Sequence, residues 1–272
     1  MTLREYLQSQ IDLIPENSNI SNPTVNNSSK IIFVNGHWST ILPGPDKGGE
    51  DYWVNATAFS LAAANSFNLT TWENKFVDGA HWLWTVASTR QAAGKTWAQN
   101  NYNDLISHSS AVLDFYLVSH SQGGAFAAGI AEYLKSKGHN IKQMVFLSCH
   151  QGADIDTDNS IEMYQMLYGK WKTVIPNVLS AFVLDLVVGD HWVPGAKYGI
   201  IIRQDLDIQY LHGQSRVSAV FEEIEDLKDV MLTDVMGPDG HIYKGQTTVP
   251  NDTLFYSLDH VFIETNAPDF NP

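Results

Sequence analysis

The chain has 272 residues, of which 44% are hydrophobic, which is enough to bury one substantial core. Its 30 acidic residues outnumber its 16 basic residues and give a formal net charge of −14 at pH 7. Such an acidic chain is not expected to bind nucleic acid or an anionic membrane surface.

Targeting signals and membrane spans are not evident in the sequence. Residues 1–17 contain acidic side chains and no apolar stretch of the signal-peptide type. No window of about 20 residues is apolar enough for a transmembrane segment. We therefore expect a soluble chain without a signal peptide, either cytoplasmic or exported by a specialised secretion system. Cys149, the one cysteine, lies in an apolar run and is expected to be a buried core thiol.

The first part of the chain predicts a short helix, a linker and the start of a compact domain. Apolar residues at helical spacing over 2–14 end at Pro15, and a segment rich in Asn and Ser follows. We expect an N-terminal helix and linker over 1–29 and one domain over 30–272. Residues 30–34 (KIIFV) predict its first buried strand, and 39–50 predict a loop.

Alternating helix and strand signals follow. They predict a helix from Asp51 to about residue 67, a strand over 75–79 and a helix over 89–108. Between the last two, His81, Trp82 and Trp84 form an aromatic group. These side chains either line a substrate pocket or pack as part of the core or of a lid.

The segment Ser119–Gly124 joins a predicted buried strand (111–118) to a predicted helix (123–136). A serine on such a turn is exposed when a small residue precedes it by two positions and a glycine follows it by two. Ser121 meets both conditions, with Ser119 in place of the first glycine of G-x-S-x-G. The alternative is an ordinary strand-to-helix turn.

The His-Ser-Gln-Gly-Gly sequence between strand and helix resembles the α/β-hydrolase superfamily, and within it the lipase- and esterase-like members. The resemblance implies that Ser121 is a nucleophile. It also implies an oxyanion hole formed by the backbone amides of Gln122 and of His37 or Trp38, which follow the first strand. A plain turn after that strand is the alternative for residues 35–38.

The middle of the chain predicts one more strand and one more helix. Gly138 predicts the end of the helix, and 141–149 predict a buried strand. Residues 160–172 predict a helix, on whose covering face lie Met163, Met166, Leu167 and Trp171. Asp154, Asp156 and Asp158 alternate but lack the glycine and glutamate of a calcium-binding EF-hand loop, so we expect a solvated loop and no metal site.

The predicted strand 179–188 is followed by Gly189-Asp190 and then by Val193-Pro194. This resembles the place where α/β hydrolases carry the acid of the catalytic triad. Asp190 would then orient the catalytic imidazole and stabilise its charged form without taking the proton. The alternative is an aspartate in a surface turn.

Two histidines compete for the role of the base, which in this fold follows the acid along the chain. His212 ends a predicted strand (207–211) and precedes an amphipathic helix over 217–231. His260, in Leu258-Asp259-His260, is similar to the histidine of some fungal-type triacylglycerol lipases, but the same residues fit a hairpin tip. His241 is a minor third candidate. His37 and His120 would orient groups near the nucleophile and not act as the base.

Together these signals predict a doubly wound, mostly parallel α/β sheet of the α/β-hydrolase type, with a C-terminal hairpin or flap around Pro238-Asp239-Gly240. The predicted function is hydrolysis of carboxylic esters, with a small-molecule or lipid ester as substrate and no cofactor. The alternative is a binding or scaffold protein with a hydrolase fold and no activity. A toxin-like lipase, with a delivery or immunity protein as its partner, is compatible with the sequence.

Overall fold

The computed structural model describes residues 29–38, 47–81, 85–107, 111–169, 193–196, 198–203, 215–222, 224, 234–236, 242–244 and 261–265. The predictions for residues 1–28 lie outside this part of the chain. So do those for Trp82, Trp84, Asp190, His212 and His260.

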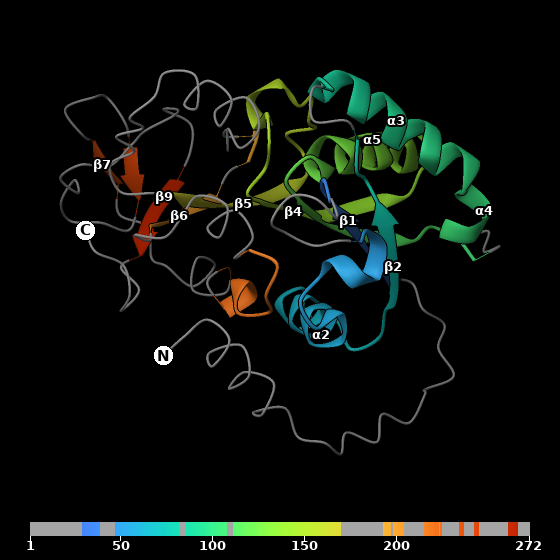
Figure 1. The fold of residues 1–272 in the computed structure, drawn as a ribbon, viewed down its shortest axis with the longest axis horizontal. Coiled ribbons are helices and arrows are strands. Elements are labelled where there is room, and N and C mark those ends of the chain that lie inside the picture. The colour runs from blue at the N-terminus through green and yellow to red at the C-terminus, as the bar shows by residue number, and fades with distance from the viewer. Residues whose placement is uncertain are drawn as a thin grey trace, which may run out of the picture.

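A sheet of seven parallel strands forms the centre of the described structure, in the order β2-β1-β3-β4-β5-β6-β9 (Figure 1). The strands are β1 (Ser29–Asn35), β2 (Glu73–Asp78), β3 (Asp114–His120), β4 (Asn140–Leu147), β5 (Glu162–Gly169), β6 (Tyr198–Arg203) and β9 (Val261–Thr265). Because β2 lies on one side of β1 and all later strands lie on the other, the strand order reverses between β1 and β3. Open α/β sheets bind their ligands at the carboxyl ends of the strands beside such a reversal.

Helices cover both faces of this sheet. They are α2 (Ala56–Ser66), α3 (Ala87–Asn100), α4 (Tyr102–Leu105) and α5 (Gly123–Ser136), with short 3-10 helices η1 (Gly49–Tyr52) and η2 (Gly152–Asp154). Figure 1 shows α3 and α5 on one side of the sheet and α2 on the other. The fold is therefore the doubly wound, mostly parallel α/β sheet that the sequence predicts. Within the described ranges, no helix has the length and the apolar character of a membrane span.

The core has two layers because successive residues of a strand face opposite sides of the sheet. On β1, Ile32 and Val34 pack toward α3 and α5, and Ile31 and Phe33 pack toward α2. All four are fully buried. Strands covered on both faces read as continuous apolar runs, which is why the sequence marks these strands so clearly.

The predicted helix over 160–172 is wrong, because residues 162–169 form β5. Met163 and Met166, which share a helical face in the prediction, lie on opposite faces of the sheet, one in each core layer. Residues 163–166 of β5 are all buried, but Gln165 interrupts the continuous apolar run that marks β1, so the strand is not evident from the sequence. The next strand, β6, has no counterpart among the predicted elements.

Other boundaries shift by a few residues. The helix expected from Asp51 begins at Ala56, because Asn55 adopts a left-handed conformation (φ +49°) and its side chain accepts a hydrogen bond from the Ala58 N–H at 3.2 Å. The helix expected over 89–108 is divided at Asn101 into α3 and α4. Gly138 ends α5 as predicted, with φ +85°.

The C-terminal region holds the predicted hairpin. β7 (Asp234–Met236) pairs in antiparallel fashion with β8 (Ile242–Lys244), one strand on each side of the predicted turn. β9, which the sequence analysis assigns to a second hairpin as one alternative, instead adds to the main sheet parallel to β6.

Candidate active site

Ser121 lies at the sharp turn between β3 and α5, with its backbone in the left-handed region at φ +55°. In residues other than glycine this backbone conformation costs free energy, so it persists only where the surrounding structure holds it. Here the Ser121 N–H donates to the Leu147 carbonyl oxygen at 2.9 Å. The Ser121 carbonyl oxygen accepts from the N–H groups of Gly124 (3.1 Å) and His150 (3.2 Å). The backbone of the turn has the geometry predicted for a nucleophile elbow. The prediction that this serine is exposed is wrong, because Ser121 packs against Gly36 at the end of β1 and is only 5% exposed.

Two glycines allow this turn to pack directly against the end of β1. A Cβ atom at Gly36 would lie 2.6 Å from the Ser121 Cβ and 2.8 Å from the His120 carbonyl oxygen. A Cβ atom at Gly123 would lie 2.5 Å from the Val34 carbonyl oxygen. Because these neighbours are mostly backbone atoms, they have little freedom to move aside. The glycine two positions after the serine is thus required by close packing of backbones, and the reversal between β1 and β3 is where this packing occurs.

Ser119, which replaces the first glycine of the motif, is accommodated without opening the turn. It is 1% exposed, and its hydroxyl donates to the Val145 carbonyl oxygen on β4 at 3.2 Å. The departure from G-x-S-x-G therefore costs the elbow little, since the added hydroxyl has a partner.

The predicted oxyanion residues lie around Ser121. Gln122 is the N-cap of α5, a helix of 14 residues whose amino end carries partial positive charge. Gly36 contacts Ser121, so the chain that continues to His37 and Trp38 begins beside the nucleophile. The structure thus brings together Ser121, Gln122 and the loop of residues 36–38.

A network centred on Asp78, at the end of β2, fixes this loop. The Asp78 carboxylate accepts from the Asn35 side chain (2.8 Å) and from the Trp38 indole (3.0 Å). Asn35 also donates to the Gly36 carbonyl oxygen (2.8 Å), and its own oxygen accepts from the Gly49 N–H (2.7 Å). Rigid backbone around a reacting group is what electrostatic stabilisation of a transition state needs.

The ring nitrogens of His120 and His37 contact groups other than Ser121. His120 Nδ1 lies 2.5 Å from the Tyr52 hydroxyl, and His37 Nδ1 lies 3.2 Å from the His81 carbonyl oxygen. Burial, together with the positive charge of Arg90, lowers the pKa of His81 below its ordinary value. The roles predicted for His37 and His120 stay predictions.

His150 is a neighbour that the sequence analysis missed. It follows β4, its N–H holds the Ser121 carbonyl oxygen, and its side chain is fully buried. Its place just after the carboxyl end of the predicted strand 141–149 was the available signal. Cys149 beside it is a buried core thiol, as predicted.

The remaining predicted catalytic residues, Asp190, His212 and His260, lie outside the described residues. Their neighbours along the chain are described: Val193, Ser215 and Val261 each have a defined place relative to the sheet. Among the described residues, no group of three His, Cys, Asp or Glu side chains is placed to hold a metal ion.

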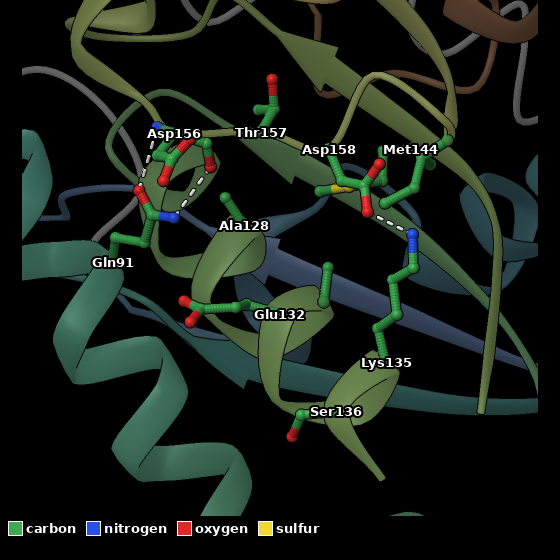
Figure 2. Close-up of a pocket in the computed structure, with 11 residues that line it drawn as sticks. Gln91, Ala128, Glu132, Lys135, Ser136, Met144, Asp156, Thr157 and Asp158 are labelled. Carbon is green, nitrogen blue, oxygen red and sulfur yellow. Dashed lines mark hydrogen bonds and ion pairs between the residues drawn. The ribbon is translucent and has the colours of Figure 1, made fainter. Parts of the chain in front are cut away.

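A groove of about 320 Å³ lies away from Ser121, between Gln91 of α3, the second half of α5 and the loop before β5 (Figure 2). Lys135 forms an ion pair with Asp158 across it, and Gln91 makes two hydrogen bonds with the Asp156 backbone (2.8 and 3.1 Å). Ser121 and Gln122 do not line this groove. The aspartates of the predicted loop are therefore used in contacts with neighbouring side and main chains.

The fold and the elbow define an α/β protein with a strained serine at the switch point of a parallel sheet. No protein-family model matches the chain, and no curated protein matches it. Among solved structures, it is similar to the RedJ thioesterase from the prodiginine biosynthetic pathway in Streptomyces coelicolor, with 10% identity and a TM-score of 0.35. The likeness covers 83% of this chain and 96% of that one. A likeness this distant does not extend to substrate or mechanism.

Proposed function

We propose that the protein is a serine hydrolase that cleaves carboxylic esters. The observation that carries this proposal is the backbone of Ser121, held at φ +55° between β3 and α5 and packed against Gly36. A strained serine at this point of a parallel sheet is costly to maintain, and it places a hydroxyl where the ends of two strands and a helix amino terminus meet.

In the proposed reaction, the Ser121 hydroxyl attacks the ester carbonyl carbon while His212 accepts its proton. The resulting oxyanion is stabilised by the N–H groups of Gln122 and of His37 or Trp38. The bond to the alcohol then breaks, and the alcohol leaves with the proton from His212. Water, deprotonated by His212, attacks the acyl-enzyme, and Ser121 recovers its proton as the acid is released.

The described chain next to His212 supports its choice as the base. Ser215, three residues later, is fully buried, and its hydroxyl donates to the Ser148 hydroxyl at 3.2 Å. Ser148 directly follows Leu147, whose carbonyl oxygen holds the Ser121 N–H. Three residues span at most about 11 Å, so the place of Ser215 supports the proposal of His212 as the base.

The strand next to His260 argues against the rival base. Val261, the following residue, pairs with Tyr198, and this register continues through Tyr164 and Val145 to Val118 on β3. Four steps between neighbouring strands amount to about 19 Å across the sheet. Val261, the described residue next to His260, therefore lies far from β3, which favours His212 as the proposed base.

Asp190 is proposed as the residue that orients His212. Val193, three residues after Asp190, is fully buried, and its N–H donates to the Gln165 side chain on β5 at 2.7 Å. β5 is the second strand from β3, so the place of Val193 supports the choice of Asp190 as the acid. We further propose that the substrate has an apolar acyl group. This proposal is based on Trp38, in the loop of residues 36–38, and on the aromatic run from His81 to Trp84.

The test is hydrolysis of p-nitrophenyl esters with short and long acyl chains by the wild type and by Ser121→Ala, His212→Ala and His260→Ala. Ser121→Ala and His212→Ala should each lower kcat by about 10⁴-fold or more, and His260→Ala should stay within about twofold of the wild type. Circular dichroism should show that each variant is folded. The binding or scaffold alternative would be favoured if the wild type hydrolysed no ester, or if Ser121→Ala hydrolysed esters as fast as the wild type.

A further inference from the structure

Tyr52 connects the turn at Ser121, here called the nucleophile turn, to the segment that follows His212. Its hydroxyl lies 2.5 Å from Nδ1 of His120, the residue before Ser121. Its carbonyl oxygen accepts from Nη1 of Arg216 at 2.9 Å, and the Arg216 guanidinium carbon lies 5.2 Å from the centre of the Tyr52 ring. One residue of η1 therefore contacts both the turn and the residue four positions after His212.

Arg216 is fixed by its backbone as well as by its side chain. Its carbonyl oxygen accepts from the Val54 N–H at 3.2 Å, just after η1. The preceding residue, Ser215, is bonded to Ser148 on the other side of the nucleophile turn. The segment 215–216 is therefore held at two points, by Ser148 after β4 and by the residues in and after η1.

The chemistry of the pair suits a fixed contact. Burial raises the pKa of Tyr52 above its ordinary value, so its phenol stays protonated at neutral pH and Arg216 faces a neutral ring. A guanidinium can stack on an aromatic face and donate a directed hydrogen bond at the same time, which a lysine cannot reproduce. Tyr52 is itself packed against Trp53, with ring centres 5.4 Å apart, so it has little freedom to follow a moving partner.

We propose that Tyr52 and Arg216 form a latch that holds the segment bearing His212 at a fixed distance from Ser121. Arg216 is then a positioning residue, which acts on catalysis through His212 and not by contact with the substrate. The proposal rests on the proposed function for its effect on catalysis, but the latch itself is a structural claim that can be measured separately.

The kinetic test compares Arg216→Gln and Arg216→Lys with the wild type. Lys137→Gln is the matched control, because Lys137 also places a cation over a tyrosine ring (5.2 Å from the Tyr133 centre) at the far end of α5. Arg216→Gln should lower kcat by about tenfold to a hundredfold with KM unchanged within about twofold, since small displacements of a catalytic group have effects of this size. Arg216→Lys should recover part of this loss, and Lys137→Gln should match the wild type.

The decisive comparison repeats Arg216→Gln in the His212→Ala background. If Arg216 acts through His212, adding Arg216→Gln to the His212→Ala variant causes no further loss of kcat. A further loss of the same size as in the wild-type background, or a kcat for Arg216→Gln within about twofold of the wild type, would overturn the proposal.

Hydrogen–deuterium exchange tests the latch without relying on activity. Amides in the peptide covering 204–222 should exchange at least about threefold faster in Arg216→Gln than in the wild type and in Lys137→Gln. Unchanged exchange would overturn the latch even if the enzyme is active. Faster exchange in a protein that hydrolyses no ester would keep the latch and refute the proposed function.

Discussion

The two ends of α5 differ in what surrounds them. At the amino end, residues 123–131 are all buried, and Gly123 touches the backbone of β1. At the carboxyl end, Glu132, Lys135 and Ser136 line the groove of Figure 2, and ion pairs at the surface hold Glu132 and Lys135. Backbone contacts cannot adjust, whereas long side chains can. The rigid end carries the candidate nucleophile, and the adjustable end tolerates change.

The largest effect is expected from Gly123→Ala. The new methyl group would lie 2.5 Å from the Val34 carbonyl oxygen and 2.6 Å from that of Asn35, so the helix must move away from β1. Thermal or urea unfolding should show a loss of about 1–3 kcal/mol, and ester hydrolysis should fall more than the folded fraction does.

Gly138→Asn is the matched change at the other end of α5. Gly138 has φ +85° but no atom within 4 Å of an added Cβ, and asparagine tolerates left-handed backbone better than most residues. Gly138→Asn should lower the free energy of unfolding by less than about 1 kcal/mol and leave ester hydrolysis unchanged. Equal losses in Gly123→Ala and Gly138→Asn would contradict the contrast between the two ends.

An intermediate, pH-dependent effect is expected at His139, just after α5. Its Nδ1 accepts from the Leu113 N–H at 3.2 Å, its Nε2 lies 2.9 Å from the Tyr102 hydroxyl, and burial lowers its pKa below the ordinary value. The unfolded chain therefore binds a proton at a higher pH than the folded chain. The stability from His139 is complete above about pH 6.5 and is lost as the pH falls from there toward the folded pKa, by at most about 1.4 kcal/mol per pH unit.

His139→Asn should flatten this dependence, because the amide oxygen can accept from Leu113 without titrating. Urea unfolding of both proteins between about pH 7 and pH 5 measures the difference. An equally steep pH dependence in His139→Asn would show that other groups cause it.

The smallest effect is expected from Lys135→Gln. This change removes the ion pair with Asp158, whose pKa the lysine lowers, and the hydrogen bond to Ser160. Both side chains are about 43–44% exposed, so the pair should contribute no more than about 1 kcal/mol, and less at high salt. Ester hydrolysis should be unaffected. A loss of activity would show that the groove takes part in catalysis.

The sequence predicts the strands and the helix around Ser121 because the residue patterns that indicate them are local. α5 matches its predicted bounds of 123–136, and β1 and β4 match theirs within a few residues. An apolar run followed by small residues determines a strand, a turn and a helix without help from the rest of the chain. Ser121, Gln122 and the loop at 36–38 meet because the strands that precede them, β3 and β1, are neighbours in the sheet.

The predictions are wrong where the local signal is mixed. In β5, the buried Gln165 interrupts the apolar run, and the spacing of Met163 and Met166 also fits a helix. The contacts of Ser215 with Ser148 and of Arg216 with Tyr52 join residues far apart in the chain, and no pattern in the sequence indicates them. The proposed preference for His212 over His260 rests on the sheet register, which no local pattern in the sequence indicates.

The most direct test of the central claim is covalent labelling with a fluorophosphonate, which reacts with activated serines, followed by peptide mapping by mass spectrometry. Ser121→Ala and Ser136→Ala, one change at each end of α5, are labelled in parallel. We predict one adduct on the peptide that contains Ser121 in the wild type and in Ser136→Ala, and none in Ser121→Ala. The absence of an adduct in the folded wild type, or an adduct on another serine, would contradict the assignment of Ser121 as the nucleophile.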